Sequence, residues 1–181
     1  MKLLLHLMGD LHMPLHTENL ARGGLDIPVL FDEKETNLHS AWSINIPQKI
    51  TSSNGTTEVL AARTWAEKLH IWTSNQAFAE DFWATGEELF SESELGDGNQ
   101  KQRLELVKRI ESNIRIVAWA RETNRWVCNY VLKDGGEGVE GKELGGDYYD
   151  GAVLVVEGLI ARAGRRLGGL INALAEEHGP W

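Results

Sequence analysis

The first sixteen residues contain four side chains that can bind a metal ion, and this limits how the segment can fold. They are His6, Asp10, His12 and His16. The leucines and methionines around them predict a helix whose sides are largely buried. Because side chains four positions apart share one face of a helix, His6 and Asp10 can hold one ion between them. Pro14 ends the helix soon after, so His16 turns away from that face but stays close to it.

A metal site is one of two interpretations of this stretch. A single histidine on an apolar helix is more often a hydrogen-bonded core residue than a ligand. Burying three histidines and an aspartate together in apolar surroundings, however, costs free energy unless something pairs with them. Zinc accepts mixed imidazole and carboxylate ligands, and catalytic zinc sites keep one position open for water. The joint pattern therefore favours a zinc site.

The composition indicates one globular domain that spans residues 1–181. Hydrophobic residues make up 42% of the chain, the mean hydropathy is −0.30, and no apolar run approaches the ~20 residues of a membrane span. A net charge of −9 argues against a protein that coats duplex nucleic acid with a basic face. Bound metal ions could still supply local positive charge.

The sequence predicts neither a targeting segment nor an internal disulfide. His6 and Asp10 interrupt the apolar start of the chain before it reaches the ~7–15 residues of a signal-peptide core. The chain has one cysteine, Cys128, which cannot form a disulfide within the chain. Either the protein is intracellular or this cysteine lacks its partner.

After residues 6–16, which we call the ligand stretch, we expect a polar loop, a small β-hairpin and a short helix. Residues 26–31 predict a short strand whose proline places it at a sheet edge, and a charged turn follows. Asn37 is expected to cap a short helix that ends near Pro47. His39 lies near the start of this helix, from where it could face the first one.

Three further segments carry apolar residues at helical spacing. They are residues 58–75, 112–132 and 147–176. A glycine-rich loop at 135–146 separates the last two, and the glycines inside the last helix suggest close packing against other helices. The linker at 52–57 contains a glycosylation sequon at Asn54, and residues 87–102 are interpreted as an exposed irregular segment. The sum is a mainly α-helical protein with one small hairpin.

Several of these motifs resemble the zinc-dependent single-strand nucleases of fungi and plants. The block that opens the chain is specific, and the later blocks are supportive. Together they extend over almost the whole chain. The main blocks are His6-Leu-Met-Gly-Asp10-Leu-His12-Met-Pro-Leu-His16, Arg22-Gly23-Gly24-Leu25-Asp26, Thr36-Asn37-Leu38-His39-Ser40-Ala41-Trp42 and Ile46-Pro47-Gln48-Lys49.

The resemblance implies a helical phospholipase C/nuclease-type fold with three zinc ions at the bottom of a cleft. It implies a secreted glycoprotein that cuts single-stranded DNA and RNA to leave 5′-phosphates and removes 3′-phosphates from nucleotides. We therefore expect single-stranded nucleic acid or nucleotides as the substrate, no membrane partner, and a monomer.

By position, the resemblance also implies roles for the site residues. His6 would bind one zinc of a close pair, and Asp10, the catalytic candidate, would bridge both. His16 and His39 would hold the third zinc. Ser43 stands where the family has an aspartate that completes this third site, and a neutral hydroxyl is a poor zinc ligand near neutral pH. His12 matches no family ligand and is interpreted as a supporting or structural residue.

Other positions depart from the family pattern. Leu25 replaces the usual asparagine beside the cleft, and Arg22 is a weak candidate for phosphate contact, with a solvated surface arginine as the alternative. The family also carries zinc ligands upstream of the block that opens this chain. The chain therefore resembles the carboxy-terminal portion of such an enzyme, with the amino-terminal helices missing. Cys128 agrees, because the matching family cysteine pairs with one in that upstream portion.

These departures leave three hypotheses. In the first, the chain is a partial zinc nuclease whose activity is impaired. In the second, it is a non-catalytic relic or binding module that keeps part of the nuclease fold, which Ser43 and Leu25 favour. In the third, it is an intracellular helical interaction protein with incidental histidines. The third does not explain the spacing of His6, Asp10, His16 and His39, so we rank it last.

Overall fold

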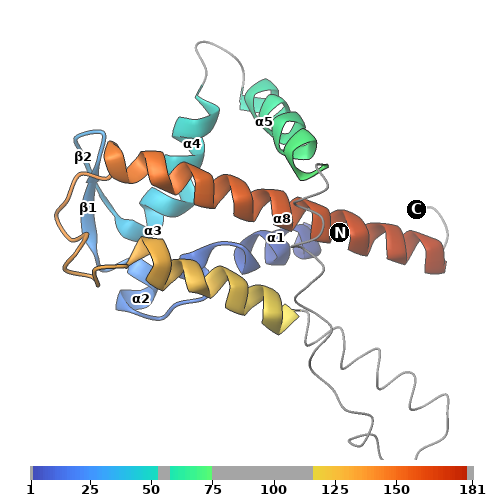
Figure 1. Ribbon diagram of the computed structural model, residues 1–181, viewed down its shortest axis with the longest axis horizontal. Coiled ribbons are helices and arrows are strands. Elements are labelled where there is room, and N and C mark those ends of the chain that lie inside the picture. The colour runs from blue at the N-terminus through green and yellow to red at the C-terminus, as the bar shows by residue number, and fades with distance from the viewer. Residues whose placement is uncertain (1, 53–57, 75–115, 179–181) are drawn as a thin grey trace, which may run out of the picture.

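The computed structural model describes residues 2–52, 58–74 and 116–178, and the description below is confined to them (Figure 1). The linker with the Asn54 sequon lies mostly outside these residues, as does the segment at 87–102. The expected helix at 112–132 lies partly outside them.

One long helix organises the described chain. α8 (Asp147–His178) runs along the length of the molecule in Figure 1. Among the helices that contact it are α1 (Lys2–Leu11), α4 (Ile46–Thr51) and α5 (Glu58–Thr73). The fold is mainly α, as the sequence predicted.

Another helix, which precedes α8 in the sequence, lies on the opposite side of α1 from α8 in the view of Figure 1. It spans residues 116–126 and continues into the π-helix η4 (Val127–Val131). A glycine-containing loop then leads to α8, as expected. Gly151 of α8 lies against the ring of Tyr130, where an added Cβ would come within 2.8 Å of the ring atom Cε2.

Short elements connect the first helix to the fourth. They are η1 (Pro14–His16), α2 (Ala21–Gly24), β1 (Pro28–Phe31), β2 (Lys34–Asn37), α3 (Leu38–Ser40) and the π-helix η2 (Ala41–Asn45). Asn37 caps α3 as predicted, because its side-chain oxygen accepts a hydrogen bond from the backbone of Ser40. The two strands pair antiparallel and form a two-stranded sheet.

A tight turn joins the strands at Asp32 and Glu33, whose φ angles are 49° and 65°. Two residues in this left-handed region are typical of the hairpin turn that matches the twist of the strands. The carboxylate of Glu143 accepts hydrogen bonds from both backbone N–H groups, at 2.9 and 2.8 Å. The loop before α8 is thereby tied to the hairpin.

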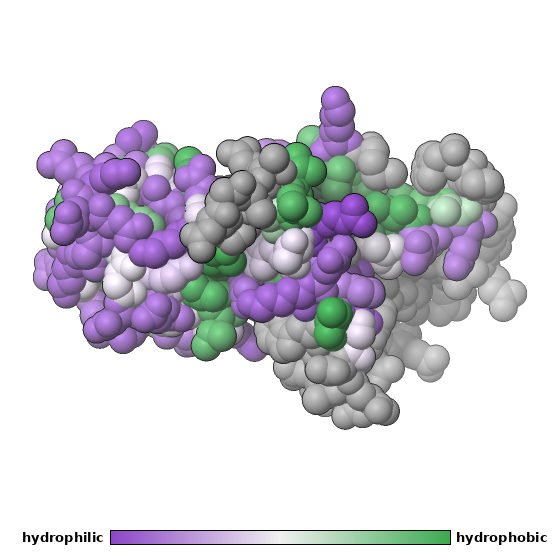
Figure 2. Space-filling model, turned by 90° about the horizontal axis from the view of Figure 1, so that it is seen from above, coloured by the Kyte–Doolittle hydropathy of each residue, from purple (hydrophilic) through white to green (hydrophobic). Residues whose placement is uncertain are grey.

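The hydrophobic core lies between the hairpin, the α3–α4 segment, η4 and the first half of α8. Its fully buried members include Leu15, Leu38, Ile46, Leu144 and Leu159. From above, the hairpin end is covered mainly by hydrophilic residues, while apolar residues gather along the middle of the molecule (Figure 2). The core therefore anchors the end of the ligand stretch, at Leu15, and the segment that follows it.

Three expectations about the helices were wrong in detail. The helix that starts at Asn37 does not end near Pro47. It continues through η2 and α4 to Thr51, because Pro47 occupies the first turn of α4, where its missing N–H costs no hydrogen bond. In α1, Met8 is buried but Leu3 is 70% exposed, because α8 covers one face of this helix.

The third correction concerns the glycines of α8. At Gly164, Gly168 and Gly169, no described atom lies within 4 Å of an added Cβ. The close packing expected of the glycines is thus not found at these three positions among the described residues, whereas Gly158, for which it was also expected, is buried.

Candidate metal-binding site

The helix α1 brings His6 and Asp10 together, as their spacing predicts. His6 Nε2 lies 3.2 Å from Asp10 Oδ2, and the His6 side chain is 72% exposed. The pair lies on the surface of the helix and is open to solvent. An ion could therefore reach both side chains without any movement of the core.

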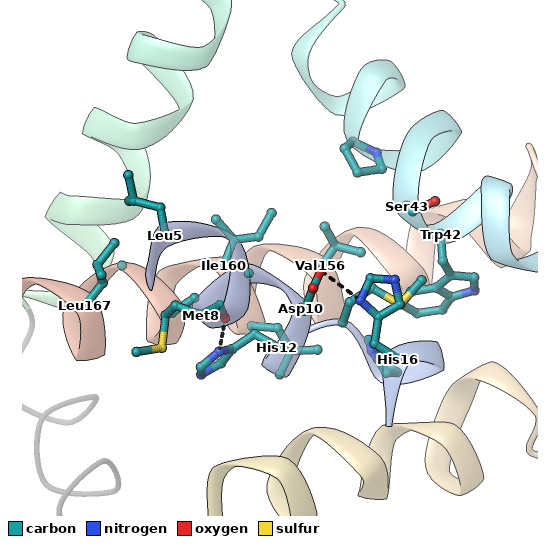
Figure 3. A pocket seen from close by; sticks show the side chains of 17 residues that line it. Leu5, Met8, Asp10, His12, His16, Trp42, Ser43, Val156, Ile160 and Leu167 are labelled. Carbon is teal, nitrogen blue, oxygen red and sulfur yellow. Dashed lines mark hydrogen bonds and ion pairs between the residues drawn. The ribbon is translucent and has the colours of Figure 1, made fainter. Parts of the chain in front are cut away.

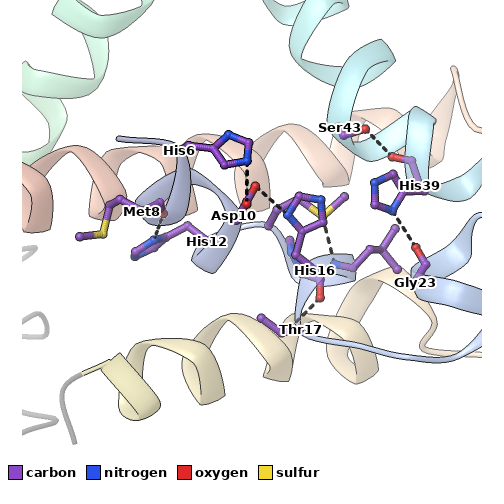
Figure 4. Close-up of polar contacts among 12 residues, drawn as sticks. His6, Met8, Asp10, His12, His16, Thr17, Gly23, His39 and Ser43 are labelled. Carbon is purple, nitrogen blue, oxygen red and sulfur yellow. Dashed lines mark hydrogen bonds and ion pairs between the residues drawn. The ribbon is translucent and has the colours of Figure 1, made fainter. Parts of the chain in front are cut away.

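His16 approaches the same carboxylate from the turn after the helix. Met13 is extended, with φ −102° and ψ 115°, and Pro14 then starts the short helix η1. This break directs His16 back toward α1, where its Nδ1 lies 3.1 Å from Asp10 Oδ1 (Figure 4). One carboxylate is thus held between two imidazoles.

His39 joins the group from the start of α3. Its ring stacks on the ring of His16, with centroids 5.1 Å apart and planes 28° apart. Its Nδ1 lies 2.9 Å from the carbonyl oxygen of Gly23. A carbonyl oxygen can only accept, so Nδ1 donates, and in the neutral ring this leaves the lone pair on Nε2. A backbone bond of this kind commonly fixes the tautomer and orientation of a metal-binding histidine.

The residue types present fit zinc. One carboxylate and three imidazoles are ligands that zinc accepts, and His39 has the expected supporting hydrogen bond. In the described residues, however, no three His, Cys, Asp or Glu side chains converge in a metal-binding arrangement. The described part of the chain therefore supplies a partial ligand set.

Ser43 does not complete that set. Its Oγ donates a hydrogen bond of 2.8 Å to the carbonyl oxygen of His39, one turn earlier in the same helical segment (Figure 4). A hydroxyl used in this way is not directed toward the imidazoles of His16 and His39.

His12 is buried, with 4% of its surface exposed, and it points away from the other histidines. Its Nδ1 donates to the Met8 carbonyl oxygen at 2.8 Å, and its Nε2 accepts from Arg166 Nη1 at 2.7 Å. Burial lowers the pKa of His12 from 6.5 to about 4. Both ring nitrogens are engaged, which suits the structural role predicted for this residue.

Arg22 lines a shallow hollow together with Asp10, His16 and His39. Its guanidinium forms two hydrogen bonds with Asp26, at 2.8 and 2.5 Å. Both partners are exposed, and the Arg22 hydrogen bond holds the pKa of Asp26 below its usual value. The contact of Arg22 with a phosphate stays a prediction.

An apolar groove of about 490 Å³ adjoins the site on its other side (Figure 3). Side chains of α1, α8 and the η2–α4 segment form its walls. Residues that line the groove and are labelled in Figure 3 include Leu5, Met8, Asp10, His12, His16, Trp42, Ser43, Val156, Ile160 and Leu167. Asp10 and His16 lie at the end of the groove where it meets the polar hollow.

The S1/P1 nuclease family model matches residues 1–176. The chain belongs to the S1/P1 nuclease family. Nuclease S1 of Aspergillus oryzae is 32% identical over 179 residues, covering 98% of this chain and 54% of that protein. Nuclease PA3 of a Penicillium species and Nuclease P1 of Penicillium citrinum are each 30% identical, covering 96% of this chain and 57% of those proteins. The chain thus spans about half the length of the curated relatives it matches.

The S1/P1 family match extends well beyond the histidines. It includes the hairpin and runs to residue 176, almost to the end of α8. Cys128 is exposed, and the chain has no second cysteine with which it could pair. None of the helices in the described ranges is both long enough and apolar enough to span a bilayer.

The residues that hold the ligand stretch from outside were not predicted from the sequence. Glu122 and Arg166 form an ion pair, and Arg166 donates to His12. Asn124 donates to the carbonyl oxygen of Thr17 at 2.8 Å. Arg166 stands among apolar positions of α8, which is a weak sequence signal for its contacts with Glu122 and His12. No sequence pattern pairs residues 17 and 124.

Proposed function

We propose that this chain forms part of a zinc-dependent nuclease that hydrolyses phosphodiester bonds of single-stranded DNA and RNA to give 5′-phosphates. The same site would remove 3′-phosphates from nucleotides. The observation that carries the proposal is the placement of the Asp10 carboxylate between His6 and His16, with His39 stacked on His16. The family match and the names of the relatives support the reaction type.

The proposed ligand roles follow this geometry. His6 and Asp10 would contribute to a close pair of zinc ions, and His16 and His39 to a third. When bound, zinc supplies positive charge beside the phosphate and a nucleophilic water at neutral pH. The protein orients its own ligands: the Gly23 carbonyl oxygen fixes the tautomer of His39, and Asp10 fixes the ring of His16.

Because the net charge of the chain is −9, the proposed substrate should bind well only after metal ions have bound. An acidic protein repels the phosphates of a nucleic acid. Zinc ions beside Asp10 would reverse the local sign and attract a phosphate into the hollow. We expect Arg22 to contribute little, since Asp26 already neutralises it.

We further propose that the 181-residue chain has low activity when it acts alone. Its four candidate ligands would be shared among three ions, and the Ser43 hydroxyl is bonded to the His39 carbonyl oxygen. The ions should therefore be held loosely. Residues 1–181 would thus be a single but partial nuclease domain.

The alternative is a non-catalytic binding module that keeps the fold. Ser43 and Leu25 favour it, because both replace polar groups of the family site with residues that contribute less to metal or substrate binding. In this case the chain would bind single-stranded DNA in the hollow without cutting it.

A cleavage assay on single-stranded DNA with added zinc tests the proposal, with strand binding followed in parallel by fluorescence anisotropy. We expect weak cleavage that a chelator abolishes and that Asp10→Asn removes. Asp147→Asn, which changes an exposed carboxylate at the start of α8, should have no effect. Binding without cleavage would support the module. Cleavage that needs neither zinc nor Asp10 would contradict the proposal.

We also propose that the protein is a secreted monomer that associates with no membrane. The exposed Cys128 is compatible with oxidising surroundings, where it could pair with a cysteine outside this chain. Light scattering during size-exclusion chromatography under reducing conditions should give the mass of one chain, 20.2 kDa. A mass of two chains would contradict the monomer.

A further inference from the structure

The turn that carries His16 is bonded at both ends to helices far away in the sequence. We call residues 12–17 the ligand turn. It begins directly after α1 and contains the extended residue Met13 and the short helix η1. Hydrogen bonds within the turn, such as those from the backbone N–H groups of His16 to Met13 and of Thr17 to Pro14, fix its local shape. They do not fix how the turn lies against the helices around it, which depends on outside contacts.

The first outside contact holds His12 at the start of the ligand turn. Arg166 of α8 is buried, with 1% of its side chain exposed, and it donates to His12 Nε2. The same guanidinium pairs with the Glu122 carboxylate and lies 4.8 Å from the centre of the Trp119 ring. Glu122 also pairs with Arg162, at 2.9 Å. His12 is thus joined to two helices at once.

The second outside contact holds Thr17 at the end of the ligand turn. Asn124 Nδ2 donates to the Thr17 carbonyl oxygen at 2.8 Å and lies 3.3 Å from its hydroxyl. The Thr17 hydroxyl donates back to the Pro14 carbonyl oxygen, which closes η1. Thr17 lies against the helix of residues 116–126 (Figure 4). Glu122 and Asn124 are on this same helix, which therefore braces both ends of the turn.

We propose that Asn124 and Arg166 are positioning residues that hold the ligand turn so that His16 meets both Asp10 and His39. The proposal rests on the zinc site proposed above. Neither residue touches Asp10, His16 or His39 through any contact described here. Each instead fixes one end of the six-residue segment that carries His16.

The geometry explains why these residues should affect the direction of the His16 side chain and not only the stability of the fold. The core holds Leu15 of the turn, with 1% exposed, while the His16 side chain is 32% exposed. Packing therefore limits the turn at Leu15 but not the direction in which His16 points. The bond from Asn124 reaches the residue next to His16, so its loss should free the histidine while the core stays intact.

Zinc affinity and the absorption spectrum of bound cobalt(II) test the proposal on the full 181-residue chain. Asn124→Ala should weaken zinc binding by up to about tenfold, the lower end of the loss seen when a group bonded directly to a metal ligand is removed, because Asn124 bonds to Thr17 beside His16. It should also change the cobalt spectrum. Arg166→Lys should act in the same direction, because an ammonium group cannot serve His12 and Glu122 with the fork of a guanidinium.

Glu157→Gln is the matched control. Glu157 is a buried residue of α8 that accepts from Lys68 Nζ at 2.6 Å and from Trp65 Nε1 at 3.0 Å. These two bonds join α8 to α5 and do not involve the ligand turn, so their loss should lower the melting temperature and leave zinc affinity unchanged. Asn124→Ala should do the reverse, with a small change in melting temperature and a large one in affinity.

Two results would overturn the inference. The first is that Asn124→Ala and Arg166→Lys bind zinc as the unmodified chain does, with the same cobalt spectrum. The second is that zinc affinity falls equally in Glu157→Gln, since the effect would then follow stability alone. If the unmodified chain binds no zinc, the proposed function fails as well, and this inference fails with it.

Discussion

At the scale of single residues, zinc binding should depend on the hydrogen bonds that each candidate ligand already makes. Asp10 has an imidazole at each of its oxygens, and His39 keeps Nε2 available because Nδ1 is bonded to Gly23. Ser43 is the contrasting case. Its hydroxyl is already used within the helix, at 2.8 Å from the His39 carbonyl oxygen.

Changing Ser43→Asp should raise zinc affinity. A carboxylate cannot donate to the His39 carbonyl oxygen, so it has no reason to keep the position of the hydroxyl, and it adds a charged ligand one turn after His39. We expect an increase of at least about tenfold, in line with ligand-shell changes, measured by chelator competition. Ser43→Asn is the control of similar shape. An equal increase with asparagine would show that charge and coordination are not the cause.

At the scale of elements, two connections between them bring distant parts of the backbone close together, at Gly23 of α2 and at Gly145 in the loop before α8. Gly23 has a φ of +65°, and an added Cβ would lie 2.6 Å from the Leu15 carbonyl oxygen. Gly145 is similarly confined, with an added Cβ 2.8 Å from the Asp32 backbone nitrogen. These are positions where the chain passes close to itself and where a side chain does not fit.

Gly23→Ala should therefore lower both stability and zinc affinity. The strained backbone conformation and the contact with Leu15 should cost about 1–3 kcal/mol of unfolding free energy. They should also displace the carbonyl oxygen that orients His39. Thermal unfolding and zinc titration measure the two effects.

Gly169→Ala is the opposite test, since it places alanine in α8 where no described atom lies within 4 Å. It should raise the unfolding free energy by about 1 kcal/mol through helix propensity. A loss of stability there would show that this face of α8 is packed after all.

The stability that Glu143 gives to the hairpin should depend on pH. The backbone N–H of Glu33, and then that of Gly145, lower the pKa of this carboxyl below its ordinary value of 4.5. A lowered folded pKa means that the stabilisation is complete above the ordinary value and is lost as the pH falls through the folded value.

Glu143→Gln should therefore reduce stability at neutral pH by about 1 kcal/mol, the usual worth of such hydrogen bonds. The deficit should shrink as the pH falls below 4.5. Glu140→Gln, at an exposed position of the same loop, should show neither effect in denaturant titrations. A deficit that persists unchanged in acid would contradict the role of the charge.

At the scale of the whole molecule, the sequence predicted much of the fold. The 3.6-residue periodicity located α5 and α8, and the turn residues located the hairpin. Proline spacing located the break before His16. These features are local, so they can be read from neighbouring residues. The extension of α4 past Pro47 was missed because a proline is tolerated in a first turn and excluded only later.

The site was predicted in part, for the same reason. His6 and Asp10 are one helical turn apart, so their contact follows from spacing. The approach of His39 to His16 was expected only as a possibility, since it depends on the loop between them. The bonds from Asn124 to Thr17 and from Arg166 to His12 span 107 and 154 residues, and no local pattern encodes them.

The central claim, that the histidines of the two segments bind zinc together, is tested most directly by zinc titration of the unmodified chain and of His39→Ala. His70→Ala, an exposed histidine of α5, is the control. We predict zinc binding by the unmodified chain and by His70→Ala, and an affinity at least about tenfold weaker in His39→Ala. Equal zinc binding by all three chains, or none by the unmodified chain, would contradict the account.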